Sequence, residues 1–386
     1  EAGDMPVFFA FGTHCISTNS FYPCFRRQMR LMGCLCRSSQ NGIIYQSQSG
    51  FVKRNRRQVY GVNEMDNMYL SRGASKVVQM CAGVQAGEQV LIITEQSRES
   101  IARALATEVY RVGAEPILCV MEPRSQDGQE PPRSIAAAMK ASDVFLSVVG
   151  RSITHTHAVK DAIAAGSRGL VLTQFTEEMM IHGGIEGDFA SLKPVCIAMA
   201  QALAGAEKVV LTSPGGTHLE YSAAGRRGNH LYCMVEKGQF STLPTVEANV
   251  SPLEGTASGV IVADGSIPYI GIGVLEEPVT MKVKDGRITS ISGGRQAQIL
   301  ADDLAAKNDP NVYNIAEHGV GLNPACRFCG FMLEDEGVYG SCHIGIGTSI
   351  TLGGKIKASC HYDVIMKNGT IIADGRALMK DGQVLL

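Results

Sequence analysis

From Glu64 onward, short apolar runs alternate with longer segments in which apolar residues recur at helical spacing. The helical segments include SRESIARALATEVYRVG and LKPVCIAMAQALAGA. Apolar strands separated by helices are typical of a parallel sheet that is covered on both faces. We therefore predict an α/β domain with a doubly wound parallel sheet over residues 65–230. The expected strands are QVLIIT, PILCVM, VFLSVVG, GLVLTQ and KVVLTSP.

The pattern changes after residue 230. Strand-length segments there contain Asp-Gly and Asn-Gly pairs, which favour tight hairpin turns between antiparallel strands. One helical segment, RQAQILADDLAAKN, interrupts them. We therefore predict a second, α+β domain over residues 231–386. The turn-bearing segments are VKDGRITSI, VIMKNGTIIADG and LMKDGQVLL.

The first 64 residues follow neither pattern. No Asp or Glu occurs from Met5 to Asn63, whereas arginines and lysines are frequent. We expect residues 1–64 to form a basic, poorly packed arm. An organellar transit segment and translated upstream sequence are alternative interpretations.

Length, composition and charge limit what kind of protein this chain can be. A chain of 386 residues exceeds the roughly 250–300 residues at which single cores stop growing, so it is long enough for two domains. The net charge of −2 offers no basic surface for nucleic acid. No apolar run reaches the roughly 18 residues that a membrane span requires. The 12 cysteines are irregularly spaced, which favours a reducing cytoplasm.

Two histidines and an aspartate are candidate metal ligands. In CHYDV, His361 and Asp363 lie two apart on a predicted strand, so their side chains share a face. An imidazole and a carboxylate directed into one pocket could supply two ligands to a metal ion. The alternative is a surface His–Asp hydrogen bond. His343, in GSCHIGIG, lies in a glycine-flanked apolar strand. It could bind metal or be an ordinary core histidine.

Glutamates in apolar surroundings complete the candidate set. Glu317, in NIAEHGVGLNP, is poorly placed for solvation, and a buried charge needs a partner or a metal. Its neighbour His318 would point elsewhere and is interpreted as structural. Glu247 lies between two prolines in LPTVEANVSP. The triplet 334–336 would ordinarily be a solvated loop, although one member could reach a metal held by His343.

Four of these motifs carry a family resemblance. LPTVEANVSP, IAEHGVGLNP, EDEGVYGSCHIGIG and GGKIKASCHYD resemble the successive metal-site motifs of the aminopeptidase T/aminopeptidase S family of metallo-exopeptidases. The likeness extends over residues 65–386. It implies two domains, a dinuclear divalent-metal site in the second domain, and a homodimer. The metal ligands that it implies are Glu247, Glu317, His343, His361 and Asp363, with Glu336 as a looser candidate.

Two departures from that family affect the expected reaction. The aminopeptidases have a tyrosine seven residues after the histidine of GSCHIGIG, where this chain has Ile350. GGKIKASCHYD also resembles 2,5-dihydroxypyridine 5,6-dioxygenases, which hold one ferrous ion. Those enzymes have a histidine at the position of Glu317 and lack the histidine found here at His343. The presence of Glu317 and His343 therefore favours a hydrolase.

The expected function is a hydrolase that uses a metal-activated water against a small amide or the N-terminal bond of a short peptide. Two zinc, cobalt or manganese ions would balance the charge of three carboxylates better than one iron would. Glu317 and Glu336 are the expected catalytic carboxylates. The alternative is a non-heme Fe(II) dioxygenase that cleaves a hydroxylated N-heterocycle. A third possibility is a ligand-binding protein without catalysis.

Overall fold

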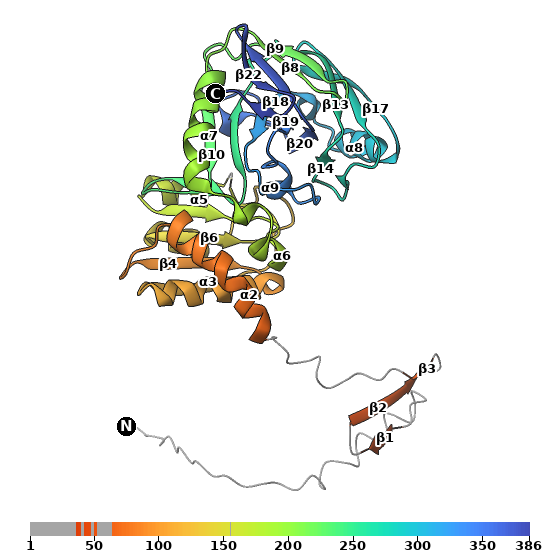
Figure 1. The fold of residues 1–386 in the computed structure, drawn as a ribbon. Helices are drawn as coiled ribbons and strands as arrows, with labels where there is room; N and C mark the ends of the chain where they lie inside the picture. The colour runs from red at the N-terminus through yellow and green to blue at the C-terminus, as the bar shows by residue number, and fades with distance from the viewer. Residues whose placement is uncertain (1–35, 40–41, 48–49, 52–63, 155) are drawn as a thin grey trace, which may run out of the picture. The chain divides into compact units, whose positions relative to one another are not determined.

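The computed structural model describes residues 36–39, 42–47, 50–51, 64–154 and 156–386. Most of the expected basic arm, residues 1–64, therefore lies outside the described residues. The exceptions within it include three short antiparallel strands, which are β1 (Cys36–Ser39), β2 (Gly42–Ser47) and β3 (Gly50–Phe51). Residues Glu64–Leu386 form a separate compact unit (Figure 1), which the following paragraphs describe by itself.

The expected parallel sheet is present in a mixed α/β fold. Its strand order is β11-β7-β6-β4-β5, and all its pairs are parallel. Val90 of β4 belongs to an apolar core that includes Leu105 of α3, whereas Leu91 belongs to a second core with Met139 of α4. Successive residues of one strand thus belong to different apolar cores. Helices α3 and α4 both contact β4. The strands are β4 (Gln89–Thr94), β5 (Glu115–Val120), β6 (Val144–Val148), β7 (Arg168–Val171) and β11 (Phe240–Thr242).

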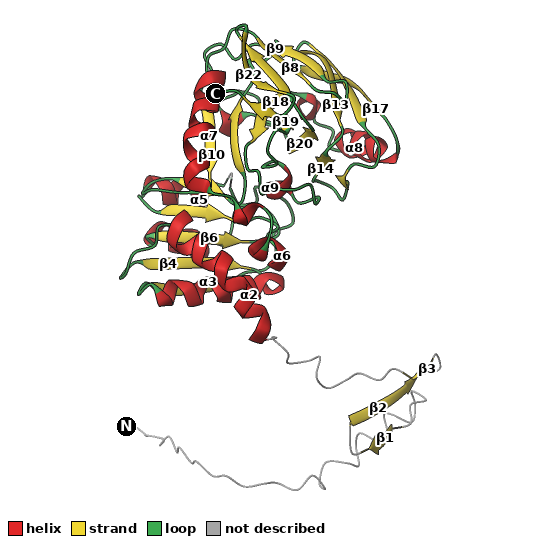
Figure 2. Ribbon diagram, in the orientation of Figure 1, coloured by secondary structure: helices red, strands yellow, loops and turns green. Residues whose placement is uncertain are grey.

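Helices fill most of the connections in this half of the unit (Figure 2). Thr156 begins α5 by accepting a hydrogen bond from Val159 N. None of the described helices is long and apolar enough to span a membrane. The helices are α2 (Glu64–Ser75), α3 (Glu99–Arg111), α4 (Arg133–Ala141), α5 (His157–Ala164), α6 (Glu177–Ile181) and α7 (Phe189–Leu203).

The strand KVVLTSP does not join the parallel sheet, so that expectation is wrong. This strand, β8 (Val209–Thr212), pairs antiparallel with β9 (His218–Tyr221) and with β21 (Thr370–Ala373). The connection from β8 to β9 is too short for the crossover that a parallel pair requires. The edge position in the parallel sheet is instead taken by β11, from residues beyond the expected domain boundary at 230/231.

The described residues of the second half contain two large antiparallel sheets and a two-stranded one, and hairpin turns form at the Asp-Gly pairs. Asp285 and Gly286 both have positive φ, at 49° and 74°, between β16 and β17, as a two-residue hairpin turn requires. The expected helix is present as α8 (Arg295–Ala306). The eight-stranded sheet has the order β17 (Arg287–Ser292), β16 (Val279–Lys284), β13 (Ser258–Ala263), β9, β8, β21, β22 (Arg376–Lys380), β23 (Gln383–Val384).

A five-stranded sheet lies at the centre of this half and is buried on both faces. All residues of its inner strands β12, β18 and β19 are buried. In β18 this includes a glutamate and a histidine next to each other. The strands, in spatial order, are β10 (Gly228–Tyr232), β12 (Val246–Val250), β18 (Ile315–Gly321), β19 (Cys342–Gly347) and β20 (His361–Met366).

Candidate metal centre

The register of the five-stranded sheet places all five expected ligands on one face. Glu247 pairs with Gly321, and Glu317 pairs with Gly345. Because side chains alternate along a strand, Glu247 and Glu317 share a face. The pairs Gly319↔His343, Gly345↔Asp363 and Gly347↔His361 extend this face across β19 and β20. We call it the ligand face, defined by Glu247, Glu317, His343, His361 and Asp363.

The glycines of the motifs make room for these side chains. A Cβ atom added to Gly319 would lie 2.0 Å from His343 Nε2. One added to Gly345 would lie 2.7 Å from both Glu317 Cβ and His361 Cε1. Any larger residue at either position would therefore displace a candidate ligand. This explains why the histidines and glutamates occur among so many glycines.

The ligand face contains two groups of three that could hold a metal ion, and Glu317 belongs to both. One group is Glu247, Glu317 and His343, and the other is Glu317, His361 and Asp363. In each group the potential ligand atoms lie within 4.8 Å of one another. His361 Nε2 is 2.9 Å from Glu317 Oε2 and 3.4 Å from Asp363 Oδ1. His343 Nε2 is 3.6 Å from Glu247 Oε2.

Several polar atoms of this face are buried without a hydrogen-bond partner among the described residues. They include Glu247 Oε2, His343 Nδ1 and Asp363 Oδ1. Asn249 Nδ2 donates to the other Glu247 oxygen, Oε1, at 2.9 Å. Buried polar atoms without partners are uncommon and call for an explanation. Carboxylates and imidazoles with free electron pairs are suitable ligands for a divalent cation, so the residues fit a metal.

The charges of the ligand face give the same indication. Burial raises the pKa of Glu247 to about 7, and the Glu317 and Asp363 carboxylates act in the same direction. Burial also raises the pKa of Glu336 well above its usual range, with further increases from Asp363, Glu247 and Glu317. Mutual repulsion among buried carboxylates is relieved by protons or by a cation.

His361 is oriented by the polypeptide backbone. Its Nδ1 lies 2.8 Å from the Thr348 carbonyl oxygen and donates to it, which directs Nε2 toward Glu317 and Asp363. Such a hydrogen bond fixes the ring of a metal-binding histidine. Thr348 N in turn donates to Cys360 O at 2.9 Å. The loop between β19 and β20 is thereby closed next to the ligand face.

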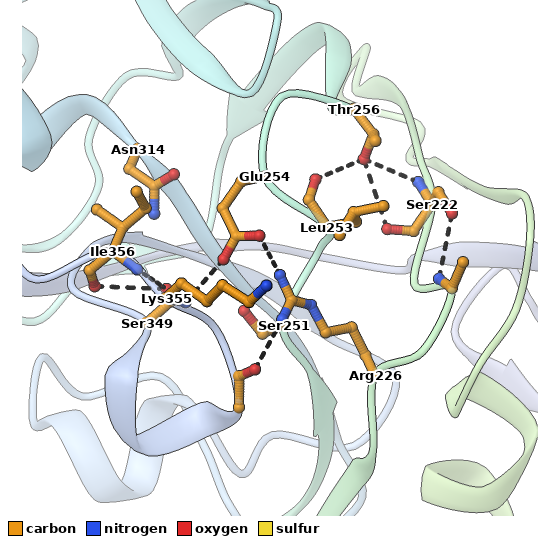
Figure 3. Close-up of polar contacts among 12 residues, drawn as sticks. Ser222, Arg226, Ser251, Leu253, Glu254, Thr256, Asn314, Ser349, Lys355 and Ile356 are labelled. Atoms are coloured by element: carbon orange, nitrogen blue, oxygen red, sulfur yellow. Dashed lines mark hydrogen bonds and ion pairs between the residues drawn. The ribbon is translucent and has the colours of Figure 1, made fainter.

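A partly buried ion pair anchors this loop (Figure 3). Arg226 donates to the Glu254 carboxylate and also, at 2.8 Å, to the Gly353 carbonyl. Glu254 Oε1 accepts a hydrogen bond of 2.7 Å from the backbone of Lys355. Glu254 therefore fixes the loop that carries Thr348. Arg226 could not be identified from the sequence, because no local pattern pairs it with residues of this loop.

The acidic triplet is not a solvated loop, so that interpretation is wrong. Glu334 accepts hydrogen bonds from Gly184 N at 2.8 Å and Arg327 N at 3.3 Å. Asp335 accepts from Cys329 N at 2.7 Å. Both glutamates of the triplet and the aspartate are buried around the short helix α9 (Met332–Asp335). Only Glu336 is directed to the ligand face, where its Oε1 lies 3.2 Å from Tyr269 Oη.

Two further side chains at the site, those of Asn249 and Tyr269, were not predicted from the sequence. Asn249, two residues after Glu247, could have been found from the alternation of strand side chains. Tyr269, whose hydroxyl lies 2.6 Å from Asp363 Oδ2, is in a turn and no sequence signal marks it. Ile350, which stands where the aminopeptidases have a tyrosine, is 51% exposed.

Comparison with known proteins identifies similar families. The model for the family described as 2,5-dihydroxypyridine 5,6-dioxygenase matches residues 70–386. The 2,5-dihydroxypyridine 5,6-dioxygenase of Pseudomonas putida KT2440 is 31% identical over 160 residues, which cover 39% of this chain and 46% of that protein. The alignment thus spans just under half the length of this curated relative.

Two solved structures are similar in fold. That of 2,5-dihydroxypyridine dioxygenase from Pseudomonas putida KT2440 superposes with a TM-score of 0.71 at 21% identity, covering 83% of this chain and 97% of the other. AmpT from Thermus thermophilus superposes with a TM-score of 0.61 at 17% identity, covering 83% and 100%. The likeness to AmpT shows a shared fold, and the expected membership of the aminopeptidase T family is not confirmed.

The expected reaction class is wrong. Both the matching family model and the curated relative are dioxygenases, and they favour the stated alternative over a hydrolase, aminopeptidase or metalloprotease. Glu317 and His343 had favoured hydrolysis because they belong to the peptidase motif. Carboxylates and imidazoles bind zinc-type ions and ferrous iron alike, so these residues indicate a candidate metal site without fixing its reaction.

Proposed function

The chain belongs to the 2,5-dihydroxypyridine 5,6-dioxygenase family, and on this premise we propose that it is an oxygen-dependent metalloenzyme. Its reaction would open the ring of a hydroxylated N-heterocycle such as 2,5-dihydroxypyridine. The family match over residues 70–386 carries the proposed reaction, and the ligand face carries the proposed metal. Buried carboxylates and imidazoles converge there, with polar atoms left unpartnered among the described residues.

We propose that Glu317, His361 and Asp363 hold the catalytic ion. A bound ferrous ion would supply the redox chemistry by which non-heme iron enzymes combine O₂ with an organic substrate. One imidazole and two carboxylates differ from the common set of two histidines and one carboxylate in such enzymes. His361 is held ready to present Nε2 because Thr348 O accepts from Nδ1.

The remaining residues of the ligand face are Glu247 and His343. Together with Glu317 they form the second group. We propose that a second divalent ion binds there. The carboxylates of Glu247, Glu317 and Asp363 carry three negative charges when ionised, and a single divalent ion would leave one uncompensated in a buried site. Metal analysis after dialysis tests this proposal, with two ions per chain expected and a single ion contradicting it.

Glu336 is proposed to handle protons during the reaction. Its Oε1 lies beside the Tyr269 hydroxyl at the edge of the ligand face. Burial and the neighbouring carboxylates raise its pKa well above the usual range, so they favour its protonated form relative to an ordinary glutamate. From this position it could transfer a proton to an oxygen atom of the substrate.

Oxygen consumption tests the proposed reaction. The purified chain is loaded anaerobically with Fe²⁺ and mixed with 2,5-dihydroxypyridine in air-saturated buffer. We expect one O₂ consumed for each ring whose ultraviolet absorbance is lost. Zn²⁺-loaded protein serves as the control and should consume none, because zinc has no accessible redox change. Iron-loaded protein that consumes no oxygen with this substrate or other dihydroxypyridines would contradict the proposal.

A further inference from the structure

Tyr269 is the one side chain of the site that lies outside every motif identified in the sequence. It occupies the turn between β14 (Ser266–Ile267) and β15 (Gly273–Val274). Its hydroxyl lies 2.6 Å from Asp363 Oδ2 and 3.2 Å from Glu336 Oε1. Because a phenol has one proton, the shorter contact identifies Asp363 as its acceptor.

The turn holds Tyr269 in place at an energetic cost. Ile270, the next residue, has a φ of 49°, a left-handed conformation that is rare for a β-branched residue. Tyr269 N donates to Ile267 O at 2.8 Å, and Ile272 N donates to Tyr269 O at 3.0 Å. Such strain costs about 1–3 kcal/mol and tends to occur at functional sites. Here it accompanies the placement of a phenol against a candidate ligand.

A second tyrosine supports the ring. Tyr362 packs on Tyr269, with ring centroids 4.9 Å apart and planes inclined by 35°. The Tyr362 hydroxyl takes no part in the ligand face, because it donates to Asp303 Oδ2 at 3.0 Å. The two hydroxyls thus belong to neighbouring rings but have different partners.

The hydrogen bond from Tyr269 makes the two carboxylate oxygens of Asp363 different. Oδ2 accepts from Tyr269, while Oδ1 is buried without a hydrogen-bond partner among the described residues and lies 3.4 Å from His361 Nε2. We propose that Tyr269 is a positioning residue that occupies Asp363 Oδ2 and leaves Oδ1 alone to bind the divalent ion. The inference rests on metal binding at the proposed site and is independent of the reaction.

Cobalt binding to matched variants tests this role. Tyr269→Phe removes the hydroxyl beside Asp363, and Tyr362→Phe removes the one beside Asp303 from the stacked partner ring. Co²⁺ affinity is measured against a competing chelator, together with the visible spectrum of the bound ion. We expect Tyr269→Phe to weaken binding about 10–100-fold, as is typical when a group supporting a metal ligand is lost. Tyr362→Phe should change affinity less than about 2-fold.

The spectrum separates positioning from general packing. In Tyr269→Phe both oxygens of Asp363 are free to coordinate, so the Co²⁺ bands should weaken as the coordination number rises. Tyr362→Phe should keep the parental spectrum. Parental affinity and spectrum in Tyr269→Phe, or equal losses in both variants, would overturn the inference. Failure of the dioxygenase assay with normal Co²⁺ binding would overturn the proposed reaction and leave the role of Tyr269 intact.

Discussion

The two faces of the five-stranded sheet are equally buried but chemically opposite. Along β18, Glu317 points to the ligand face and His318 to the other face, and both are buried. His318 Nδ1 lies 2.6 Å from the hydroxyl of Tyr221, and burial lowers the pKa of His318 to about 3. Since the imidazole is therefore neutral, the phenol donates to Nδ1. Neither member of this pair carries a charge, although His318 Nε2 is buried without a hydrogen-bond partner among the described residues.

The ligand face is only partly compensated within the described chain, where His361 Nε2 lies 2.9 Å from Glu317 Oε2 and 3.4 Å from Asp363 Oδ1. Its carboxylates repel one another, and the Glu247 and Asp363 oxygens noted above lack partners. Glycines occupy its free positions, such as Gly319 and Gly345, where the opposite face has Val320 and Ile344. A buried titratable residue is thus not by itself a sign of function. Charge without a partner, in space that glycines keep open, is the more specific sign.

The largest expected effect comes from the carboxylate common to both ligand groups. Glu317→Gln removes a charge from each group, so metal affinity should fall more than about 100-fold, beyond the loss typical of a supporting residue. Oxygen consumption should disappear with it. Isothermal titration with Co²⁺ and the oxygen electrode measure the two effects. Parental metal affinity in this variant would refute the assignment of the ligand face.

The pH dependence of stability should have opposite signs at Glu247 on the ligand face and at His318 on the other face. Without metal, folding raises the pKa of Glu247 from 4.5 to about 7, so the native state binds more protons in that window. Its contribution to stability is present below pH 4.5 and is lost as pH rises toward 7. Folding lowers the pKa of His318 from 6.5 to about 3. Its contribution is present above pH 6.5 and is lost as pH falls toward 3.

Urea unfolding of the metal-free protein across this range measures both contributions. The stability difference between wild type and Glu247→Gln should fall as pH rises from 4.5 to 7. The difference between wild type and His318→Gln should fall as pH decreases from 6.5. Differences with the same slope in both variants would contradict the contrast between the faces.

A smaller effect is expected from filling the space that a glycine provides. Gly319→Ala would place a Cβ 2.0 Å from His343 Nε2, so the imidazole must move. We expect a loss of up to about 3 kcal/mol in stability, as for other overpacked sites, together with weaker metal binding. Val320→Ala on the opposite face is the control, because it should lower stability but leave Co²⁺ affinity unchanged. Equal Co²⁺ affinity in the two variants would show that Gly319 does not protect the site.

The smallest effect concerns the neutral pair. Tyr221→Phe leaves His318 Nδ1 buried without its donor, which should cost about 1–2 kcal/mol. Metal affinity should stay parental, because the pair lies on the opposite face. Urea unfolding and Co²⁺ titration test both statements. A large loss of metal affinity would mean that the two faces are coupled through β18.

The sequence predicted those parts of the fold that depend on nearby residues. Apolar runs marked the parallel strands, and Asp285-Gly286 marked a hairpin. It failed at β8, because the identity of a strand's neighbours depends on distant segments such as Thr370–Ala373. It failed again at Glu334, whose main partner is the backbone of Gly184.

The candidate site was predicted further than its chemistry. Alternation along strands grouped His361 with Asp363. The motif resemblance joined the other three candidate ligands to them, and the structure brings all five to one face. The reaction could not be derived, because the same ligand types serve hydrolysis and oxygen chemistry. Tyr269 could not be found, because its turn approaches Asp363 only in the folded chain.

The central claim is that the ligand face binds a divalent metal ion, and anomalous X-ray diffraction from crystals soaked in Co²⁺ tests it most directly. We predict an anomalous peak bounded by Glu317, His361 and Asp363, absent from crystals of Glu317→Gln. A well-diffracting, soaked wild-type crystal with no peak at this face, or with its strongest peak elsewhere on the chain, would contradict the account.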